Sequence, residues 1–405
     1  MAAQEFEVIV YGASGFTGRL VAEHLMQTYG VDGPVRWAMA GRSRDKLRDV
    51  ATAIGAPMNT PLIAASTSDA AALDALVHRA RVVITTAGPY QRYGEPLLSA
   101  CARNGVDYVD LCGEPNWMAQ MIARYDEVAK ESGARIVFSC GFDSIPFDCG
   151  VWFLQQEAMR RFGAPCRDVR ARVRKMKGGF SGGTVASLLA TVDAVKNNPA
   201  LVKLMADPFA LSPQRMAPQP DSEHVQHDAD VASWSAPFVM AAINTKNVHR
   251  TNALTGYAYG QDFTYSEMIM TGDGAEGRER ARAMASQAKT QTMLLGFPPT
   301  RALLRTFALP KPGQGPSKQE RETGMYDIVF AGHTADGQAL RASVRGDMDP
   351  GYGSTSKMLA EAALCLSDTP RENTPGGVWT PAAAMGDTLV QRLDERAGLR
   401  FMLEN

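Results

Sequence analysis

Three evenly spaced glycines near the start of the chain have the residue type and spacing of a phosphate-binding loop. They lie in the stretch GASGFTG as Gly12, Gly15 and Gly18. The common dinucleotide fingerprint is G-x-G-x-x-G, whereas this stretch reads G-x-x-G-x-x-G, with Ser14 in the place of the middle glycine. Glycines let the backbone approach a diphosphate closely, and Ser14 and Thr17 add hydroxyl donors. The expected cofactor-binding residues of this loop are Gly12, Ser14, Gly15, Phe16, Thr17 and Gly18.

The residues on either side of these glycines supply the frame that such a loop needs. The apolar run from Phe6 to Val10 predicts a buried strand, and Phe16, Leu20 and Leu25 recur at helical spacing. A strand, a glycine turn and a helix bring the unpaired N–H groups of the helix to the turn, where they attract an anion. A tight turn without a ligand is the alternative interpretation.

The residue after the second expected strand indicates the type of nicotinamide cofactor. The stretch AGRSRDK places Arg42 there, followed by Ser43 and Arg44, while Asp45 comes too late, inside the next helix. An acidic residue at this position bonds the ribose 2′-hydroxyl of NAD, whereas arginine suits the 2′-phosphate of NADP. We therefore expect NADP(H), with Arg42 and Ser43 in its site. A solvated arginine at a helix start is the alternative.

The loop TAGPY carries the first catalytic candidate. It follows the expected strand at 81–88 and brings Ala87, Gly88 and Pro89 against the nicotinamide ribose, because this loop flanks the point where the strand order reverses. Tyr90 can then reach the substrate as an acid or a hydrogen-bond donor. A packing role for its ring is an equal alternative.

The loop CGFDSIPFD follows the sixth expected strand and carries the second candidate. It offers Gly141 to the cofactor and Asp143 as a carboxylate that orients substrate or a water. Capping of the next helix by Asp143 is the favoured alternative. We expect Cys140 to be a small buried apolar residue and Glu114 to orient the loops of this rim.

Other reaction classes lack their characteristic residues in this sequence. Short-chain dehydrogenases place a lysine four residues after a tyrosine, whereas the pairs Tyr125–Lys130 and Tyr352–Lys357 are one residue too far apart. The histidines form no metal-binding or triad pattern with their neighbours, so we expect no metal.

Two stretches in the second half of the chain are candidates for substrate contact. KMKGGFSGGT combines Lys175 and Lys177 with glycines and hydroxyls that suit an anionic ligand, and a hairpin loop explains it equally well. The apolar stretch 292–313, with its arginines and prolines, suits an acyl channel or a membrane-surface contact. An ordinary core helix with a loop is the favoured alternative.

The elements around these residues predict an α/β fold. Strand and helix patterns alternate through the first 141 residues, which indicates a doubly wound parallel sheet of six strands whose terminal loops share one rim. The pattern then becomes mixed, with a helix at 181–198. Further strands are expected at 169–179, 255–270, 326–334 and 339–347.

The same patterns predict the domain organisation. We expect an NADP-binding Rossmann domain at 1–145 and an α+β substrate and dimerisation domain at 146–375. A loop and a helix at 376–405 are expected to return to the first domain.

Composition and charge bear on the partners and the location of the protein. The 405 residues carry a formal net charge of −1, so no basic surface points to nucleic acid. No segment approaches 18 consecutive apolar residues, and no signal peptide is recognisable. Six cysteines without C-x-x-C spacing indicate reduced thiols. We expect a cytoplasmic protein, with a peripheral membrane contact and a homodimer as open alternatives.

Motifs along nearly the whole chain resemble those of the saccharopine dehydrogenase-like oxidoreductases. They are GASGFTG, AGR, TTAGPY, YVDLCGEP and CGFDSIPFD, and the later SGGT, PGQGPS and GGVWTPAAAMGD are similar to the branch that includes bacterial trans-acting enoyl reductases. The resemblance implies a Rossmann domain, a nicotinamide cofactor and a substrate domain inserted before a C-terminal return.

The resemblance also implies a function. We expect an NAD(P)H-dependent reductase of an enoyl or imine bond in a lipid or carrier-bound acyl intermediate. One alternative is an amino-acid dehydrogenase of the saccharopine type. Another is a nucleotide-binding, lipid-associated scaffold without catalysis.

Overall fold

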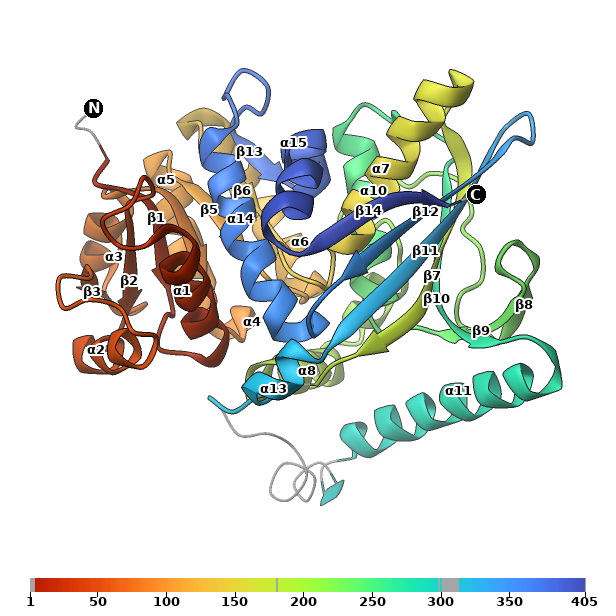
Figure 1. The fold of residues 1–405 in the computed structure, drawn as a ribbon, viewed down its shortest axis with the longest axis horizontal. Coiled ribbons are helices and arrows are strands. Elements are labelled where there is room, and N and C mark those ends of the chain that lie inside the picture. The colour runs from red at the N-terminus through yellow and green to blue at the C-terminus, as the bar shows by residue number, and fades with distance from the viewer. Residues whose placement is uncertain (1–3, 180, 298, 301–312, 405) are drawn as a thin grey trace.

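Two seven-stranded sheets organise the part of the chain that the computed structural model describes, residues 4–179, 181–297, 299–300 and 313–404. Sheet A lies toward the N-terminal side of the view in Figure 1, and sheet B lies on the opposite side. Helices α14 and α15 lie between them. The region between the two sheets is therefore where residues from both can meet.

Sheet A is parallel throughout, with the strand order β13-β6-β5-β4-β1-β2-β3. Its strands are β1 (Phe6–Tyr11), β2 (Trp37–Gly41), β3 (Leu62–Ala64), β4 (Ala80–Thr85), β5 (Asp107–Asp110), β6 (Arg135–Val137) and β13 (Gly377–Trp379). The strand order reverses at β1, which pairs with β2 on one side and β4 on the other. Ligands of open parallel sheets bind at such a reversal, beyond the carboxyl ends of the strands.

Helices cover both faces of sheet A, which explains why its central strands are continuous apolar runs. One face carries α1 (Phe16–Tyr29), α2 (Arg44–Ala53) and α14 (Thr355–Asp368). The other carries α3 (Ala70–Val77), α5 (Glu95–Asn104) and α6 (Pro115–Ser132), with the single turn α4 (Tyr90–Tyr93) at the rim. Their apolar stripes close two separate cores, one on each face.

Sheet B is mixed, with the strand order β14-β12-β11-β7-β10-β9-β8. Its strands are β7 (Cys166–Lys177), β8 (Gln226–Asp228), β9 (Ser233–Pro237), β10 (Thr264–Gly272), β11 (Met325–Thr334), β12 (Ala339–Gly346) and β14 (Leu399–Glu404). Its only parallel pair among the described residues is β7 with β10. Helix α7 (Ile145–Phe162) packs across β7, β11 and β12 and carries the chain from sheet A to sheet B.

The remaining helices surround these two sheets. They are α8 (Gly182–Asn197), α9 (Ala200–Ala206), α10 (Ala241–Leu254), α11 (Gly274–Gly296), α13 (Lys318–Glu322) and α15 (Pro381–Arg396), with the short turns η1 (Ala229–Val231) and η2 (Pro350–Ser354). Helix α11 runs from β10 along the outside of the molecule in Figure 1. The segment that precedes α13 contacts α8, where the Gly182 N–H donates to the Gln314 carbonyl at 3.0 Å.

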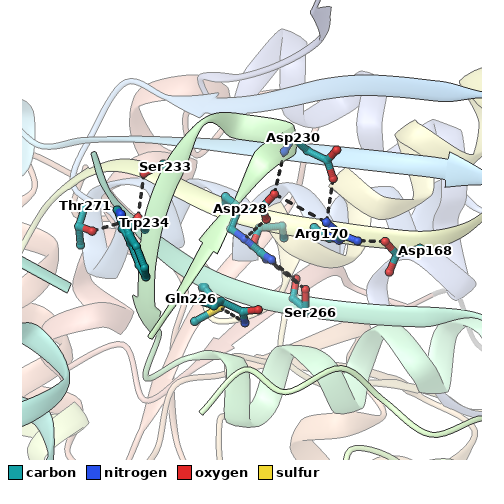
Figure 2. Close-up of polar contacts among 12 residues, drawn as sticks. Asp168, Arg170, Gln226, Asp228, Asp230, Ser233, Trp234, Ser266 and Thr271 are labelled. Carbon is teal, nitrogen blue, oxygen red and sulfur yellow. Dashed lines mark hydrogen bonds and ion pairs between the residues drawn. The ribbon is translucent and has the colours of Figure 1, made fainter. Parts of the chain in front are cut away.

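Buried charges hold the short strand β8 on sheet B. The Arg172 Nε lies 2.8 Å from Asp228 Oδ2, and both side chains are buried. Arg170 lies between Asp168 and Asp230 (Figure 2), and its ion pairs with them measure 2.9 and 3.0 Å. Because β8 is only three residues long, the Arg172–Asp228 pair supplies a contact that its backbone ladder alone does not provide, and the Arg170–Asp230 pair holds the η1 turn that follows β8.

The doubly wound α/β sheet and the second α+β layer are confirmed. The strand expected at 255–270 is partly wrong, because β10 begins only at Thr264. Gly256 and Gly260 have positive φ angles of 68° and 98°, so the chain turns before it enters the sheet. The region 376–405 contributes β13 to sheet A and β14 to sheet B, two strands that its sequence pattern did not indicate.

The domain boundaries at 145 and 375 stay a proposal. Helix α14 lies inside the predicted second domain, yet it packs on β1, β4 and β5 of sheet A. The stretch 292–313 was predicted to form an acyl channel or a membrane-surface contact, with a core helix and a loop as the alternative. Its residue 298 and residues 301–312 lie outside the described residues.

Candidate active site

The glycine loop between β1 and α1 has the backbone shape of a diphosphate cradle. Gly12 has a φ of 85°, and its N–H donates to the Ala40 carbonyl at 2.9 Å. A Cβ at Gly18 would lie 2.3 Å from the Gly12 carbonyl oxygen, so the close approach of helix to turn requires glycine there. Helix α1 has no side-chain cap at Gly15, which leaves its first N–H groups available to an anion.

Gly15 faces a different environment from Gly18. Gly15 is exposed. A Cβ placed on Gly15 would have one described neighbour within 4 Å, the Gly12 carbonyl oxygen at 3.2 Å. Ser14 is exposed beside it, and its Oγ would lie 3.7 Å from a Cβ on Gly41. The open side of the loop therefore fits a bound diphosphate and adjoins the end of β2.

Arg42 follows the last residue of β2 and is exposed. Among the described residues, no carboxylate lies within ion-pair distance of it. Burial raises the pKa of Tyr11, and the Arg42 charge offsets part of that rise, which shows that the guanidinium lies near the Tyr11 ring. Ser43 caps α2, since its Oγ accepts from the Lys46 N–H at 3.4 Å. The contact of Arg42 with a 2′-phosphate stays a prediction, and Ser43 has a structural task as the cap of α2.

The loop after β4 leans against the glycine loop. The Thr86 hydroxyl donates to the Gly12 carbonyl at 3.2 Å, and Ala87 is half-buried behind it. Gly88 is exposed, and a Cβ there would lie 3.6 Å from the Ser187 Oγ of α8. Pro89 is buried. The expected cofactor contacts of this loop and the second layer of the protein therefore meet at Gly88.

Tyr90 is placed inward rather than toward the open rim. Its side chain is buried, its hydroxyl donates to the Thr85 carbonyl at 3.0 Å, and it accepts from the Leu111 N–H at 3.4 Å. Glu114 accepts from the Tyr90 and Gln91 N–H groups at 3.0 and 2.9 Å. These contacts fit the packing interpretation of Tyr90 and the expected orienting role of Glu114. The catalytic role of Tyr90 stays a prediction, and its geometry gives it no support.

Asp143 does not cap the next helix. The capping position of α7 is Ser144, which makes no side-chain cap, so the favoured interpretation of Asp143 was wrong. Its Oδ2 lies 3.0 Å from where a Gly113 Cβ would stand, and no described residue donates a hydrogen bond to its carboxylate. Burial raises the pKa of Asp143 to about 6. A carboxyl group without a partner and with a raised pKa at a ligand-binding rim is a candidate acid or base.

Gly141 lies deeper than expected. A Cβ there would stand 3.1 Å from the Thr355 methyl group and 3.3 Å from the Leu111 Cβ. The same threonine accepts from the Phe142 N–H at 3.0 Å. Gly141 therefore lets α14 pack against this loop, and its contact with a cofactor stays a prediction.

Tyr352 is a site residue that the sequence reasoning missed. Its side chain is buried at 3% exposure, and its hydroxyl accepts from the Ser181 N–H at 2.5 Å. The same oxygen lies 2.6 Å from the Thr184 Oγ1, and the ring packs edge-on against Phe16 at 5.2 Å. Burial raises the pKa of Tyr352, and the Asp143 charge adds to the rise. Only the folded chain brings η2, α8 and the glycine loop together, so no local motif marks this residue.

Lys175 and Lys177 lie at the end of strand β7, and the chain continues into helix α8 instead of a hairpin. The Ser181 Oγ accepts from the Gly183 and Thr184 N–H groups and caps α8. Both lysines are exposed, and the Lys177 Nζ donates to the Thr323 hydroxyl at 3.3 Å. Their contact with an anionic ligand stays a prediction.

The geometry above defines a dinucleotide-binding domain, and comparisons with known proteins agree. Residues 8–137 match the family model described as the saccharopine dehydrogenase NADP-binding domain. The protein is thus an NADP(H)-dependent oxidoreductase.

Relatives extend the similarity to the whole chain. A Mycobacterium tuberculosis protein, named provisionally as a trans-acting enoyl reductase, is 41% identical over 408 residues, which cover 96% of each chain. The trans-acting enoyl reductase of Mycobacterium ulcerans is 38% identical over 417 residues, 97% of each. The chain belongs to this trans-acting enoyl reductase family of saccharopine dehydrogenase-like proteins.

Apo saccharopine dehydrogenase from Saccharomyces cerevisiae is a solved structure to which the chain is similar. It has a TM-score of 0.47 and 13% identity, and the match covers 98% of this chain and all of that one.

Among the described residues of the present protein, no helix is long and apolar enough to cross a bilayer, and no three His, Cys, Asp or Glu residues are grouped to hold a metal ion.

Proposed function

We propose that the protein reduces the carbon–carbon double bond of an enoyl thioester, with NADPH as the hydride source. The observation that carries this proposal is the rim where the glycine loop, the Gly88 loop and α8 converge beside Asp143 and Tyr352. The names of the relatives support the choice of an enoyl substrate. A carrier-bound or lipid acyl chain is the form of substrate that we propose.

The chain's own residues divide the work of binding and proton transfer. The glycine loop holds the central diphosphate of the dinucleotide, and Arg42 holds the 2′-phosphate of its adenosine ribose. Gly88 gives the substrate room beside α8. When bound, the nicotinamide supplies a hydride to the β-carbon of the enoyl group. Reduction also needs a proton at the α-carbon, and the site offers two groups that can deliver one.

Asp143 and Tyr352 are those two candidate donors. The Asp143 carboxyl, with its pKa of about 6, is partly protonated near neutral pH. The Tyr352 phenol keeps its proton to higher pH, because burial raises its pKa, and it can pass a proton through the exposed Thr184 hydroxyl 2.6 Å away. The two assignments predict different pH profiles, so they can be separated by experiment.

Apolar side chains outside the rim support an acyl substrate. Leu188 of α8 is 46% exposed, Val202 of α9 is 54% exposed, and Met293 and Phe297 at the end of α11 are 69% and 58% exposed. Helix α8 contacts both α9 and α11. We propose this apolar surface as the path of an acyl chain or as a peripheral membrane contact. Flotation with liposomes separates the two, since only a membrane contact brings the protein to the lipid fraction.

The test of the proposed reaction is NADPH oxidation with enoyl thioesters of increasing chain length. We expect oxidation at 340 nm to accompany formation of the saturated thioester, identified by mass spectrometry. Adducts of glutamate that contain an imine bond are tested as well, because they are the substrates expected of the alternative amino-acid dehydrogenase. Turnover of the adducts alone would identify an amino-acid dehydrogenase, and binding of NADPH without any turnover would identify a scaffold.

A further inference from the structure

A cavity of about 700 Å³ lies against the glycine loop, on the side that faces α13. Two of its residues, Phe16 and Arg19, belong to α1. Most of the others come from one segment, 313–321, which is far away in sequence and precedes β11. The cavity therefore joins the start of the dinucleotide-binding domain to the layer built on sheet B.

The Phe16 ring contacts residues from both sides of the cavity. The Arg19 guanidinium lies over the ring at 5.6 Å from its centroid, and that of Arg321 lies at 5.8 Å. Gly315 presses against the same ring, since a Cβ there would stand 2.4 Å from Phe16 Cε1. Two guanidinium groups are thus held at one aromatic ring, beside the first turn of α1.

In the described part of the chain, neither guanidinium is directly paired with a carboxylate, although Asp349 lies near enough for the Arg321 charge to offset part of the rise that burial causes in its pKa. Among the described residues, no Asp or Glu lies within 4.0 Å of the charged nitrogens of Arg19 or Arg321. Glu320, the acidic residue that lines the cavity, accepts from the Ser317 N–H at 2.7 Å in a capping box. Lys318 adds a third cation and pairs only at 3.7 Å with Glu322. The cavity carries a net positive charge, which favours an anionic ligand.

The segment 313–321 is held rigidly enough to form a wall of a site. The Gly182 N–H of α8 donates to the Gln314 carbonyl at 3.0 Å, and the Arg321 Nη1 donates to the Pro316 carbonyl at 2.9 Å. The Arg321 carbonyl accepts from the Asp349 N–H at 2.9 Å, which ties the segment to η2. The second layer of the protein thus presents Arg321 to the phosphate-binding end of α1.

We propose that this cavity binds a phosphate group, with Arg19, Lys318 and Arg321 as its cationic ligands. The inference rests on the proposed function, which supplies two sources of phosphate. One is the diphosphate of the dinucleotide on the adjoining glycine loop. The other is the phosphate of a pantetheine arm that carries the acyl substrate as a thioester. In either case, the site makes binding depend on contact between α1 and the segment 313–321.

The experiment compares Arg19→Gln and Lys318→Gln with the wild type, and Arg282→Gln serves as the charge-matched control. Arg282 is exposed on α11, outside the cavity. Three probes are titrated by calorimetry: NADPH, 4′-phosphopantetheine, and pantetheine without the phosphate. Arg321→Gln is added only if its thermal melting matches the wild type, because Arg321 also packs on Phe16.

If the site binds a phosphate, Arg19→Gln weakens one phosphate probe about tenfold or more, as expected for the loss of a charge-assisted contact. Weaker NADPH binding alone identifies the diphosphate, and weaker phosphopantetheine binding alone identifies the substrate arm. Pantetheine binding and the Arg282→Gln control should not change. Affinities within twofold of the wild type for both phosphate probes, in both variants, would overturn the proposal.

Failure of the phosphate site and failure of the proposed reaction give different results. Absence of turnover with every enoyl thioester would refute the reductase assignment and leave the binding result intact. Conversely, turnover with unchanged probe affinities would retain the reductase and reject the phosphate site. Raising the salt concentration should weaken the affected probe more in the wild type than in Arg19→Gln, since the lost contact is ionic.

Discussion

The central strands of sheet A and the strands of sheet B use buried residues in opposite ways. In β1, β2 and β4, the interior is apolar, and the chemistry lies at the loops beyond the strand ends. Sheet B instead buries charges within its strands, including Arg172 on β7 and Glu267 on β10. The comparison indicates that the central strands β1, β2 and β4 are a frame for a site made by the backbone of their loops, and the buried Asp107–Arg135 pair of sheet A lies on β5 and β6. Sheet B uses buried ionic partners to hold strands from distant parts of the chain.

The largest expected effect tests the ionic side of this comparison. Asp228→Ala should lower the free energy of unfolding by about 3–5 kcal/mol, because it leaves the Arg172 guanidinium buried without its carboxylate. Urea unfolding followed by circular dichroism measures the change. The double variant Arg172→Met with Asp228→Leu should recover most of the loss, since it removes both charges.

An exposed ion pair provides the control for that variant. Glu276 pairs with Arg280 on the surface of α11 at 2.8 Å. Glu276→Ala should change the free energy of unfolding by less than about 1 kcal/mol. An equal loss from Asp228→Ala and Glu276→Ala would contradict the view that burial makes the pair in sheet B important.

The second prediction concerns proton transfer at the rim of sheet A. If Asp143 is the acid, kcat falls as the pH rises through about 6, because only its protonated form can donate. Asp143→Asn should then lower kcat by about 10²–10⁴-fold and remove this pH dependence, with the NADPH affinity unchanged. The measurement is kcat against pH for both proteins.

Tyr352→Phe separates the two candidate donors. A wild-type kcat that stays flat through pH 6, together with a large loss in Tyr352→Phe, would assign the proton to Tyr352 instead of Asp143. Tyr90→Phe is the control at the same rim. Because the hydrogen bonds of the Tyr90 hydroxyl within the described chain are to backbone groups, its loss should affect stability more than kcat.

The glycine loop and the rim residues show how far the sequence alone could lead. Its strand, turn and helix are continuous in the chain, so their spacing predicted the loop, its place in sheet A and Arg42 beside it. Asp143 was found for the same local reason, although its capping role was wrong. Tyr352 and Arg321 join this site only because η2 and the segment 313–321 fold back onto α1, more than 290 residues away in sequence. Long-range contacts of this kind leave no periodic pattern.

The same reasoning applies to the strands. The alternation of apolar and basic residues predicted β7. The strands at 326–334 and 339–347 were predicted as well, although β11 is buried without alternation from Tyr326 to Gly332. Strands β8 and β13 are three residues long, which is too short for an alternation of apolar and polar residues to be recognised. Their place is fixed by distant partners: Asp228 by Arg172, and Val378 by the Asp126 carboxylate, which accepts from its N–H at 2.8 Å.

The third prediction tests the backbone-made site itself. Gly15→Val should retain the fold, since Gly15 has an ordinary extended conformation with φ −82° and ψ 170°. We expect NADPH affinity to fall by about 100-fold or more, because the side chain occupies the space of the diphosphate. Fluorescence titration of NADPH measures it.

Gly18→Ala is the contrasting variant in the same loop. Its Cβ would meet the Gly12 carbonyl oxygen at 2.3 Å, so the loop and α1 must separate. This variant should lower the melting temperature as well as the affinity. Unchanged NADPH binding in Gly15→Val would show that the diphosphate does not cross this part of the loop.

The fourth prediction concerns cofactor choice. A 2′-phosphate paired with Arg42 should gain about 1.5–3 kcal/mol, which corresponds to roughly 10- to 100-fold tighter binding of NADPH than NADH. Arg42→Ala should remove most of this ratio and leave NADH binding nearly unchanged. Arg48→Ala, on the exposed side of α2, is the control. Equal loss of both cofactors in Arg42→Ala would show that this arginine does not recognise the 2′-phosphate.

The smallest expected effect returns to the charges buried in sheet B. Burial raises the pKa of Glu267 to about 8, although the Asn244 amide and the Tyr265 hydroxyl donate to its carboxylate at 2.7 and 2.9 Å. Its ordinary value is 4.5, so above that pH the unfolded chain releases this proton while the folded chain retains it. The contribution to stability is therefore full below about pH 4.5 and is lost as the pH rises through 8.

Glu267→Gln keeps the shape of the protonated side chain and removes its titration. Between pH 6 and pH 8, the wild type should lose about 1–2 kcal/mol more unfolding free energy than the variant. Other buried carboxyl groups with raised pKa values, such as Asp110, titrate in both proteins and cancel in this difference. Urea unfolding at the two pH values measures it. Parallel losses in the two proteins would show that Glu267 is already ionised in the fold, with Arg172 as the compensating charge.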